Sequence, residues 1–416
     1  MCDNEQLTLS KTYQSKTDKE HVLDNPDTYT GPMELSEYDT YIYDDDDKHI
    51  VSKKLEIIPG LYKLFDEGIV NCRDHVKRMQ TAIENGKENT IPVTKIMIDI
   101  TDDGTITMRN DGNGIDVAQH PDNNMWIPEM IFAHLRTSTN YNKDEEDCIG
   151  GKNGFGFKLV LIWSKWGKVE TIDHIRGLSY TQVFENNLNI INKPVIRKCK
   201  NKPYTQVSFK PDYERLGITN LTKDMINLFK RRVYDIAAVT DKSVKVWLNK
   251  YQVPVQTYTQ YVDMYIGTKS ETKRVYEHAN DRWEYAVCLA KKEEFTQVST
   301  VNGIFTSKGG KHVDYVLNQI VRKLTAYIKK KKKIEVKSST IKEQLMLFIR
   351  CDIVKPTFDS QTKDYMTTPI SKFGSTCDVS DKFIDGIAKM GVMESACALT
   401  EVKENKRDLI PSVVHA

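Results

Sequence analysis

Residues Gly150–Lys158 read GGKNGFGFK, a glycine-rich stretch bounded by apolar residues. A helix is expected to leave it near Val160–Trp166, so the stretch is a loop that leads into a helix N-terminus. Backbone N–H groups of such a loop, backed by the helix dipole, favour bound phosphate, and Lys158 is placed to reach phosphate oxygens. The loop is not a Walker A motif, because the Gly-Lys-Ser/Thr ending is missing. A flexible linker is the simpler alternative, but Phe155 and Phe157 within the loop argue against it.

A long helix with one buried face is predicted within residues 55–85. Pro59-Gly60 marks its start, and apolar residues recur at helical spacing as far as Val76. Within this helix Glu67 and Asn71 are four residues apart, so they share one face. The carboxylate can take a proton from water, and the asparagine oxygen can ligate Mg²⁺. A plain polar helix surface is the favoured interpretation of this pair taken alone.

Two further segments carry candidate binding residues. The first is Asn110-Asp111-Gly112-Asn113-Gly114, which follows a predicted hairpin with its turn at Asp102-Asp103-Gly104. Its two glycines let the backbone approach a planar ligand, and Asp111 can accept a hydrogen bond from an exocyclic amine. A simple turn is the alternative. The second is Gln361-Thr362-Lys363, whose lysine would stabilise negative charge on a terminal phosphoryl group. By itself it is only a polar tripeptide.

Composition limits the class of protein without identifying it. A chain of 416 residues favours two domains, and a net charge of +2 says nothing about nucleic acid. The 8 cysteines are scattered without a Cys-x-x-Cys pair, which indicates reduced thiols rather than disulfides or zinc. The polar N-terminus argues against a secretory signal, and no apolar stretch approaches membrane-spanning length. We therefore expect an intracellular, soluble protein with no membrane partner. The acidic run Asp44–Asp47 is interpreted as a solvated loop.

The order of elements predicts an α+β fold with helices on one face of a mixed sheet. Further strands are expected at Val207–Lys210 and Val244–Leu248. The pattern then restarts after about residue 260, so we expect domains over residues 1–260 and 261–416. The second domain is expected to contain three strands and a helix, at Tyr285–Ala290, Val298–Phe305, Met346–Ile353 and His312–Lys329 respectively.

These motifs, in this order, resemble the GHKL ATPases, the group that includes gyrase, Hsp90, MutL and histidine kinases. Longer stretches are similar to the ATPase and transducer regions of eukaryotic-type DNA topoisomerase II over almost the whole chain. The segments that carry this resemblance are Tyr13–Thr17, Leu23–Gly31, Ile58–Asn71, Thr137–Tyr141, Gly151–Lys158, Val301–Tyr315 and Pro356–Lys363. The resemblance implies a GHKL (Bergerat) α/β sandwich followed by a ribosomal-S5-like α+β transducer domain.

The resemblance also implies a role for each candidate residue, with ATP and Mg²⁺ as the bound groups. Glu67 would be the general base, Asn71 would hold Mg²⁺, and Gln361 and Lys363 would reach the γ-phosphate from the second domain. Asp111 would accept from the adenine amine. The other implied ATP-binding residues are Asn110, Gly114 and Thr205 at the base, Ser138, Thr139 and Asn140 at the ribose and α-phosphate, Lys152, Asn153, Gly154, Phe155, Gly156 and Lys158 at the triphosphate, and Tyr13 in a strap that crosses to a partner subunit.

Three departures from the family pattern indicate a divergent member, and we expect a viral one. Cys72 replaces a small alanine, Thr139 stands where many relatives have serine, and Phe157 replaces a small residue before Lys158. The Asp-x-Asp motif and the tyrosine nucleophile of the DNA cleavage core do not appear after residue 370. We therefore expect this chain to hydrolyse ATP and dimerise without cutting DNA. The expected location is nuclear or, for a viral protein, at cytoplasmic replication sites.

The resemblance implies an ATP-operated clamp, a homodimer closed by ATP that captures a second DNA duplex in the full enzyme. Five consecutive lysines, Lys329, Lys330, Lys331, Lys332 and Lys333, would contact double-stranded DNA without reading its sequence. A nuclear localisation signal and a plain solvated run remain alternatives for these lysines. The alternative functions are another GHKL clamp of the Hsp90 or MutL type, a non-hydrolysing nucleotide or DNA clamp, and a histidine kinase. The presence of Glu67 argues against a silent clamp.

Overall fold

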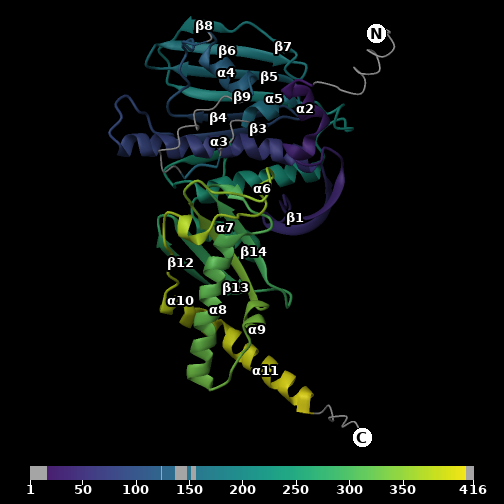
Figure 1. Ribbon diagram of the computed structural model, residues 1–416, viewed down its shortest axis with the longest axis vertical. Helices are drawn as coiled ribbons and strands as arrows, with labels where there is room; N and C mark the ends of the chain where they lie inside the picture. Colours follow the sequence, from purple (N-terminus) through teal and green to yellow (C-terminus); the bar gives the residue numbers. More distant parts are fainter. Residues whose placement is uncertain (1–15, 123, 136–147, 151–155, 409–416) are drawn as a thin grey trace, which may run out of the picture.

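The computed structural model describes residues 16–122, 124–135, 148–150 and 156–408, and it contains two bodies stacked along its long axis (Figure 1). The first body is built on a nine-stranded sheet of order β11-β10-β3-β4-β9-β5-β6-β7, with β8 also paired to β6. Its strands are β3 (Lys95–Ile100), β4 (Ile106–Asp111), β5 (Ser164–Asp173), β6 (Leu178–Glu185), β7 (Ile190–Ile191), β8 (Val195–Lys198), β9 (Tyr204–Pro211), β10 (Lys245–Leu248) and β11 (Tyr251–Gln252).

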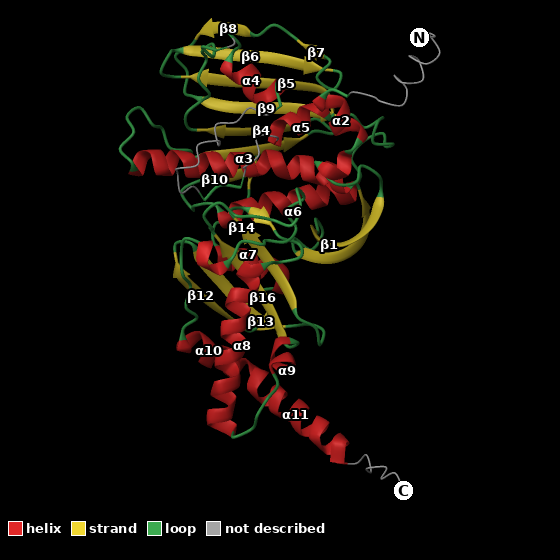
Figure 2. Ribbon diagram, viewed as in Figure 1, coloured by secondary structure: helices red, strands yellow, loops and turns green. Residues whose placement is uncertain are grey.

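Helices cover one face of this sheet (Figure 2). Strand β4 shows why, because Ile106, Met108 and Asn110 are buried while the alternate residues are only half-buried. The helices of the first body are α2 (Asp18–Asp24), α3 (Pro59–Glu84), α4 (Ile127–Ala133), α5 (Gly156–Ile162) and α6 (Lys223–Val239). A separate hairpin of β1 (Ser36–Tyr43) and β2 (Ile50–Ile57) precedes α3, and the acidic run is its turn, as expected.

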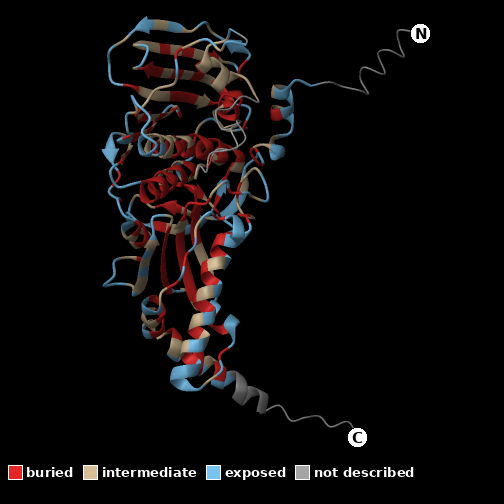
Figure 3. Ribbon diagram, turned by 60° about the vertical axis from the view of Figure 1, so that its left-hand side comes forward, coloured by how far each residue is buried: buried red, intermediate tan, exposed pale blue. Residues whose placement is uncertain are grey.

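Helix α3 carries two of the candidate residues, Glu67 and Asn71. It starts with Pro59 at its first position, where the missing N–H does no harm, and it runs for 26 residues. Its buried face meets α6, where the rings of Phe65 and Phe229 stack with centroids 4.2 Å apart. Figure 3 shows that α3 and α6 are buried where the two bodies meet. The predicted helix is therefore confirmed, although residues before Pro59 belong to β2.

The helix expected at Val160–Trp166 is displaced along the chain. It spans Gly156–Ile162, and β5 begins at Ser164. The reason is strand pairing, because Trp166 onwards forms a ladder with both β6 and β9. The hairpin around Asp102–Gly104 and the strands at Val207–Lys210 and Val244–Leu248 are confirmed.

The second body contains a five-stranded sheet of order β12-β13-β16-β14-β15, in which only β14 and β16 run parallel. Its strands are β12 (Arg274–Asn280), β13 (Trp283–Leu289), β14 (Thr296–Val301), β15 (Ile304–Phe305) and β16 (Leu345–Cys351). Helices α8 (Lys311–Lys332), α9 (Ser338–Lys342) and α10 (Asp381–Ile387) pack around its own core, and α11 (Met393–Asp408) ends the described chain. The strands near Tyr285–Ala290 and Met346–Ile353 are confirmed, and the expected helix is confirmed but continues to Lys332. The single strand expected at Val298–Phe305 is instead two antiparallel strands, β14 and β15, because Asn302 and Gly303 form a turn with positive φ. The expected α+β class is confirmed as well.

Helix α7 (Tyr258–Ile266) connects the two bodies, so the expected boundary between residues 260 and 261 falls inside a helix. Its Tyr265 ring packs edge-on against Phe348 of β16, with centroids 5.5 Å apart. The core of the first body continues through this helix onto one face of the second sheet. Within the described ranges, none of the helices combines the length and the apolar character that a membrane span needs.

Buried polar groups also hold α7 to α6. The Tyr261 hydroxyl donates to Asp235 Oδ1 at 2.7 Å and lies 2.8 Å from the Tyr265 hydroxyl. Asp235 in turn lies 3.1 Å from Arg231 and 3.6 Å from Arg232, and all three side chains are fully buried. Because an unpaired charge inside a protein is costly, each member of this group depends on the others.

We expect Tyr261→Phe to lower the free energy of unfolding by about 1–3 kcal/mol, because Asp235 loses a buried donor. Urea unfolding followed by circular dichroism measures the change. The matched control is Tyr258→Phe, since Tyr258 is about equally buried on the same helix, whereas the hydroxyl that donates to Asp235 is that of Tyr261. Equal effects of the two substitutions would contradict the importance of the Asp235 hydrogen bond.

Candidate active site

Glu67 forms the centre of a buried ion pair between the two bodies. Its side chain lies on α3, is 6% exposed, and places Oε1 3.0 Å from Nζ of Lys363. Lys363 comes from the loop after β16, 296 positions further along the chain, and is itself 7% exposed. The sequence motifs singled out separately thus meet in one contact.

A second lysine and an aspartate complete the charge balance around Glu67. Nζ of Lys63 lies 3.3 Å from Glu67 Oε1 and 2.9 Å from Asp66 Oδ2, and Asp66 also accepts from Nε of Arg232 at 2.6 Å. Burial alone raises the pKa of Glu67, but Lys363 and Lys63 outweigh burial and hold this pKa below its ordinary value of 4.5. Glu67 is therefore an ionised carboxylate at neutral pH.

The start of helix α5 faces this carboxylate. A Cβ at Gly156 would lie 2.9 Å from Nδ2 of Asn71 and 3.7 Å from Oε2 of Glu67, so only glycine lets α5 come this close. Oε1 of Glu67 is thus held by the lysines, whereas Oε2 is turned towards the end of the glycine-rich loop. The ring of Phe157 fits against the small Gly68 on α3, which explains how this chain accommodates a bulky residue before Lys158.

Asn71 and Lys158 lie beside this contact. Nδ2 of Asn71 donates to the carbonyl of Glu67 at 2.7 Å, which orients the amide and leaves its oxygen as the atom suited to a hard cation. Lys158 is buried in α5, and burial lowers the pKa of its ammonium to about 8. A buried lysine of this kind gains from an anion, because the anion restores the stability of its charged form.

A second group of residues forms a row across three strands, on the face that α3 covers. Asn110 of β4 is paired with Thr205 of β9, and Thr205 is paired with Thr171 of β5. The hydroxyls of Thr171 and Thr205 are 3.0 Å apart, and Asn110 is 7% exposed. Gly114 packs against β5 beside this row. Only glycine fits there, because a Cβ would lie 2.0 Å from the carbonyl oxygen of Ile172. A buried amide with two hydroxyls can recognise the polar edge of a flat ligand.

Thr171 was not identified from sequence. Its Oγ1 accepts from the backbone N–H of Ile115, which fixes the segment that follows the second glycine. The alternation of buried and half-buried residues in β5 could have placed Thr171 on the inner face, but its register opposite Thr205 comes only from the sheet.

The structure contradicts the role expected for Asp111. Strand alternation turns its carboxylate to the face opposite that of Asn110. There Oδ1 accepts from the backbone N–H groups of Thr94 and Lys95 at 2.7 Å and 2.8 Å, and Oδ2 accepts from the Thr94 hydroxyl at 2.5 Å. Asp111 therefore fixes the start of β3, whereas Asn110 lies on the buried face of the sheet.

The loop of Gln361 and Lys363 is held at both ends. Asp364 accepts from the hydroxyl of Ser307 at 2.7 Å, and Lys363 adopts a positive φ of 61° that aims its side chain at α3. A Cβ at Gly31 would lie 3.3 Å from Cγ2 of Thr362, so the segment after α2 packs on the loop. Gln361 is half-buried beside this contact. The other expected ATP-binding residues lie outside the described residues: Tyr13, Ser138, Thr139, Asn140, Lys152, Asn153, Gly154 and Phe155.

The five lysines Lys329–Lys333 do not reach this site. Four of them form the last turn of α8, Lys333 caps it with a left-handed conformation, and all five are exposed. Lys329 is paired with Glu335. Figure 1 shows this end of α8 pointing away from the first body.

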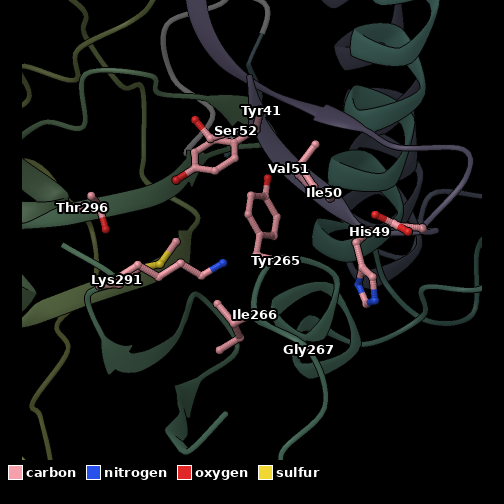
Figure 4. A pocket seen from close by; sticks show the side chains of 12 residues that line it. Tyr41, His49, Ile50, Val51, Ser52, Tyr265, Ile266, Gly267, Lys291 and Thr296 are labelled. Carbon is pink, nitrogen blue, oxygen red and sulfur yellow. The ribbon is translucent and has the colours of Figure 1, made fainter. Parts of the chain in front are cut away.

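A pocket of about 490 Å³ lies elsewhere, between the β1–β2 hairpin, α7 and the second sheet (Figure 4). Its lining includes Tyr41, His49, Tyr265 and Lys291, and none of the residues expected from sequence. The rings of Tyr41 and Tyr265 meet edge-on at 5.0 Å, so the pocket is closed on one side by packing between the bodies.

Comparisons with known proteins identify relatives of this chain. A family model described as DNA gyrase B matches residues 256–407. The chain is 41% identical to a DNA topoisomerase 2 of Arabidopsis thaliana and 40% identical to one of Acanthamoeba polyphaga mimivirus, covering 96% and 95% of this chain. It spans only 27% and 31% of the length of these relatives.

Solved structures match nearly from end to end. The ATPase region of Saccharomyces cerevisiae topoisomerase II superimposes with a TM-score of 0.86 at 38% identity, covering 95% of this chain and 99% of that one. The ATPase and transducer domains of topoisomerase II from Balamuthia mandrillaris give a TM-score of 0.87 at 36% identity, with the same coverage. This chain belongs to the type II DNA topoisomerase family and corresponds to its ATPase and transducer region.

Proposed function

We propose that this chain binds ATP with Mg²⁺, hydrolyses it, and acts as the ATP-operated gate of a type II DNA topoisomerase. The observation that carries the proposal is the buried contact of Glu67 on α3 with Lys363 from the second body. Glu67 is an ionised carboxylate and therefore suits the role of general base. Its basicity would depend on whether Lys363 pairs with it or with a bound phosphate.

The residues divide the work of hydrolysis among them. Asn110, Thr171 and Thr205 bind the adenine edge, and Lys158 binds phosphate oxygens at the start of α5. A terminal phosphate near Lys363 competes with Glu67 for the ammonium. When Lys363 moves to that phosphate, Glu67 Oε1 loses an ion-pair partner, and the carboxylate becomes a stronger base for the attacking water.

Asn71 fits the magnesium requirement. Its orienting hydrogen bond leaves one hard oxygen ligand, and no group of three or more His, Cys, Asp or Glu side chains competes for a metal within the described ranges. When bound, the ion neutralises charge on the phosphate oxygens. Among the alternatives, the near-complete match to topoisomerase II ATPase regions favours this family over an Hsp90-like or MutL-like clamp, and Glu67 favours turnover over a silent clamp.

Dimer closure and DNA capture extend the proposal to the full enzyme. Two chains close on ATP through their N-terminal segments, and a second duplex passes the lysines at the end of α8. ATP drives closure only if it binds the closed dimer more tightly than the open form. A nuclear location, or viral replication sites in the cytoplasm, stays a prediction.

We expect Glu67→Ala to lower steady-state ATP hydrolysis at least about a hundredfold, because the base is lost. A coupled assay over a range of protein concentrations measures this rate, and wild-type turnover should rise faster than linearly with protein as dimers form. Glu84→Ala, an exposed position on the same helix, is the control and should keep wild-type turnover. Full activity in Glu67→Ala would contradict the assignment of Glu67 as the general base.

We expect ATP binding to take up a proton between about pH 8 and 9. The pKa of Lys158 is lowered to about 8 by burial, and a bound phosphate raises it, so affinity falls as pH rises through that range. Calorimetry with a non-hydrolysable ATP analogue in buffers of different ionisation enthalpy measures the uptake. Lys158→Arg keeps the charge without titrating and should abolish the uptake. Unchanged uptake in that variant would exclude Lys158 as its source.

We expect the triple substitution Lys330→Gln, Lys331→Gln, Lys332→Gln to weaken binding of duplex DNA and to lower its salt slope by about 2 to 3. Fluorescence anisotropy of a labelled duplex across salt concentrations measures both quantities. The control changes three exposed lysines of the first body by the same charge, Lys193, Lys200 and Lys202 to Gln. Equal losses in the two triples would show that net charge matters rather than the end of α8.

A further inference from the structure

The turn between β14 and β15 carries a buried asparagine that joins three distant segments. Asn302 is 0% exposed and adopts a left-handed conformation with φ of 51°. Its Oδ1 accepts from the backbone N–H of Ile353 at 2.7 Å. Its Nδ2 donates to the carbonyl of Ile353 at 2.8 Å and to the carbonyl of Ile149 at 3.0 Å. One side-chain amide thus uses its acceptor and both of its donors on main-chain groups.

The two segments held by Asn302 are the roots of the two loops proposed to face phosphate. Ile353 begins the segment that leads from β16 to Lys363. Ile149 directly precedes the glycine-rich loop Gly150–Lys158. Asn302 therefore lies at a point where a segment of the first body and a segment of the second body are bound by the same side chain.

Helix α3 holds the same root from the other side. The guanidinium of Arg73 donates to the carbonyl of Cys148 at 3.2 Å and pairs with Asp352 at 2.5 Å. The carboxylate of Asp74 accepts from the backbone N–H of Gly150 at 2.8 Å. Helix α3 therefore binds Cys148 and Gly150, and the second body binds Ile149, which lies between them.

The turn itself packs closely against two arginines of the first body. A Cβ at Gly303 would lie 2.9 Å from Cδ of Arg73, and the carbonyl of Gly303 accepts from Arg232. Arg232 is the residue that also pairs with Asp66, next to Glu67 on α3. The turn is therefore packed against the helix that carries the proposed base.

We propose that Asn302 is a positioning residue that keeps residues 148–150, which precede the start of helix α5, in register with the Lys363 loop, so that Lys158 and Lys363 can contact one triphosphate at the same time. The proposal rests on the proposed ATPase function and deepens it. Asn302 lies beside Ile149 and Ile353 rather than in the row of Asn110, Thr171 and Thr205. The loss of the Asn302 side chain should therefore impair the hydrolysis step more than the binding of the adenine ring of ATP.

The test compares two asparagines in equivalent turns. Asn249 also has a positive φ, of 47°, in the β10–β11 turn, and its Oδ1 accepts from the backbone N–H of Ile100 at 2.8 Å. Glycine adopts this conformation readily, so Asn302→Gly and Asn249→Gly both preserve the turn and remove one anchoring amide. Asn302→Gly should lower kcat on the order of tenfold, because buried hydrogen bonds at both loop roots are lost. KM for ATP should stay within about threefold, and Asn249→Gly should change neither value.

A double-mutant cycle separates positioning from simple destabilisation. Single-turnover rates with enzyme in excess are measured for Asn302→Gly, Lys363→Ala and the pair. If Asn302 acts through the Lys363 loop, adding Asn302→Gly to Lys363→Ala should slow hydrolysis less than about twofold. A full tenfold effect in both backgrounds would overturn the proposal, as would wild-type kcat in Asn302→Gly.

Hydrogen exchange supplies a readout that does not depend on turnover. In Asn302→Gly the amides of residues 148–150 and of residues 353–363 should exchange faster together, whereas Asn249→Gly should leave both unchanged. Faster exchange confined to the β14–β15 turn would contradict the shared anchor. A wild-type chain without ATPase activity would refute the proposed function, and the exchange result would still decide whether Asn302 joins the two loops.

Discussion

The contact between Glu67 and Lys363 is the constraint on which the arrangement of the two bodies depends. Both groups are almost completely removed from water, so separating them is costly unless a substitute partner is present, although Glu67 keeps its contact with Lys63. The pairing brings the loop after β16 onto helix α3, where the Arg73–Asp352 pair and the core that continues through α7 also join the two bodies. A terminal phosphate is the substitute that would let the two groups separate.

The charges around this pair are arranged as a chain rather than as isolated bridges. Lys63 links Glu67 to Asp66, and Asp66 links Lys63 to Arg232, which reaches the carbonyl of Gly303 in the second body. Such a network adds less stability than its number of contacts suggests, because desolvation offsets much of the attraction. The network instead couples distant parts of the structure. A shift of Lys363 would change the electrostatic interactions of the charged residues on α3 and, through Arg232, those at the β14–β15 turn.

Local sequence patterns predicted part of the architecture. The helical spacing from Leu61 to Val76, the glycine-containing hairpin turn and the strands β3, β4, β9, β10, β13, β14 and β16 were recovered, whereas β5 to β8, β11 and β12 were not expected. The helix after the glycine-rich loop was placed four residues too late, because Leu159, Val160 and Leu161 suit a helix or a buried strand equally well. The assignment of Asp111 failed for a similar reason, since a motif read as letters does not show which side of β4 each residue faces.

The sequence by itself determined the candidate chemistry: a carboxylate and an amide one helical turn apart, a glycine-rich loop ending in a lysine, and a distant lysine suited to phosphate. Only the tertiary structure decided which of these groups meet. The ion pair of Glu67 with Lys363, the row of Asn110, Thr205 and Thr171, and the three-way anchor at Asn302 join residues that lie far apart along the chain. The physical reason is that periodicity and turn chemistry act over a few residues, whereas sheet register and the burial of paired charges are settled only when whole elements pack.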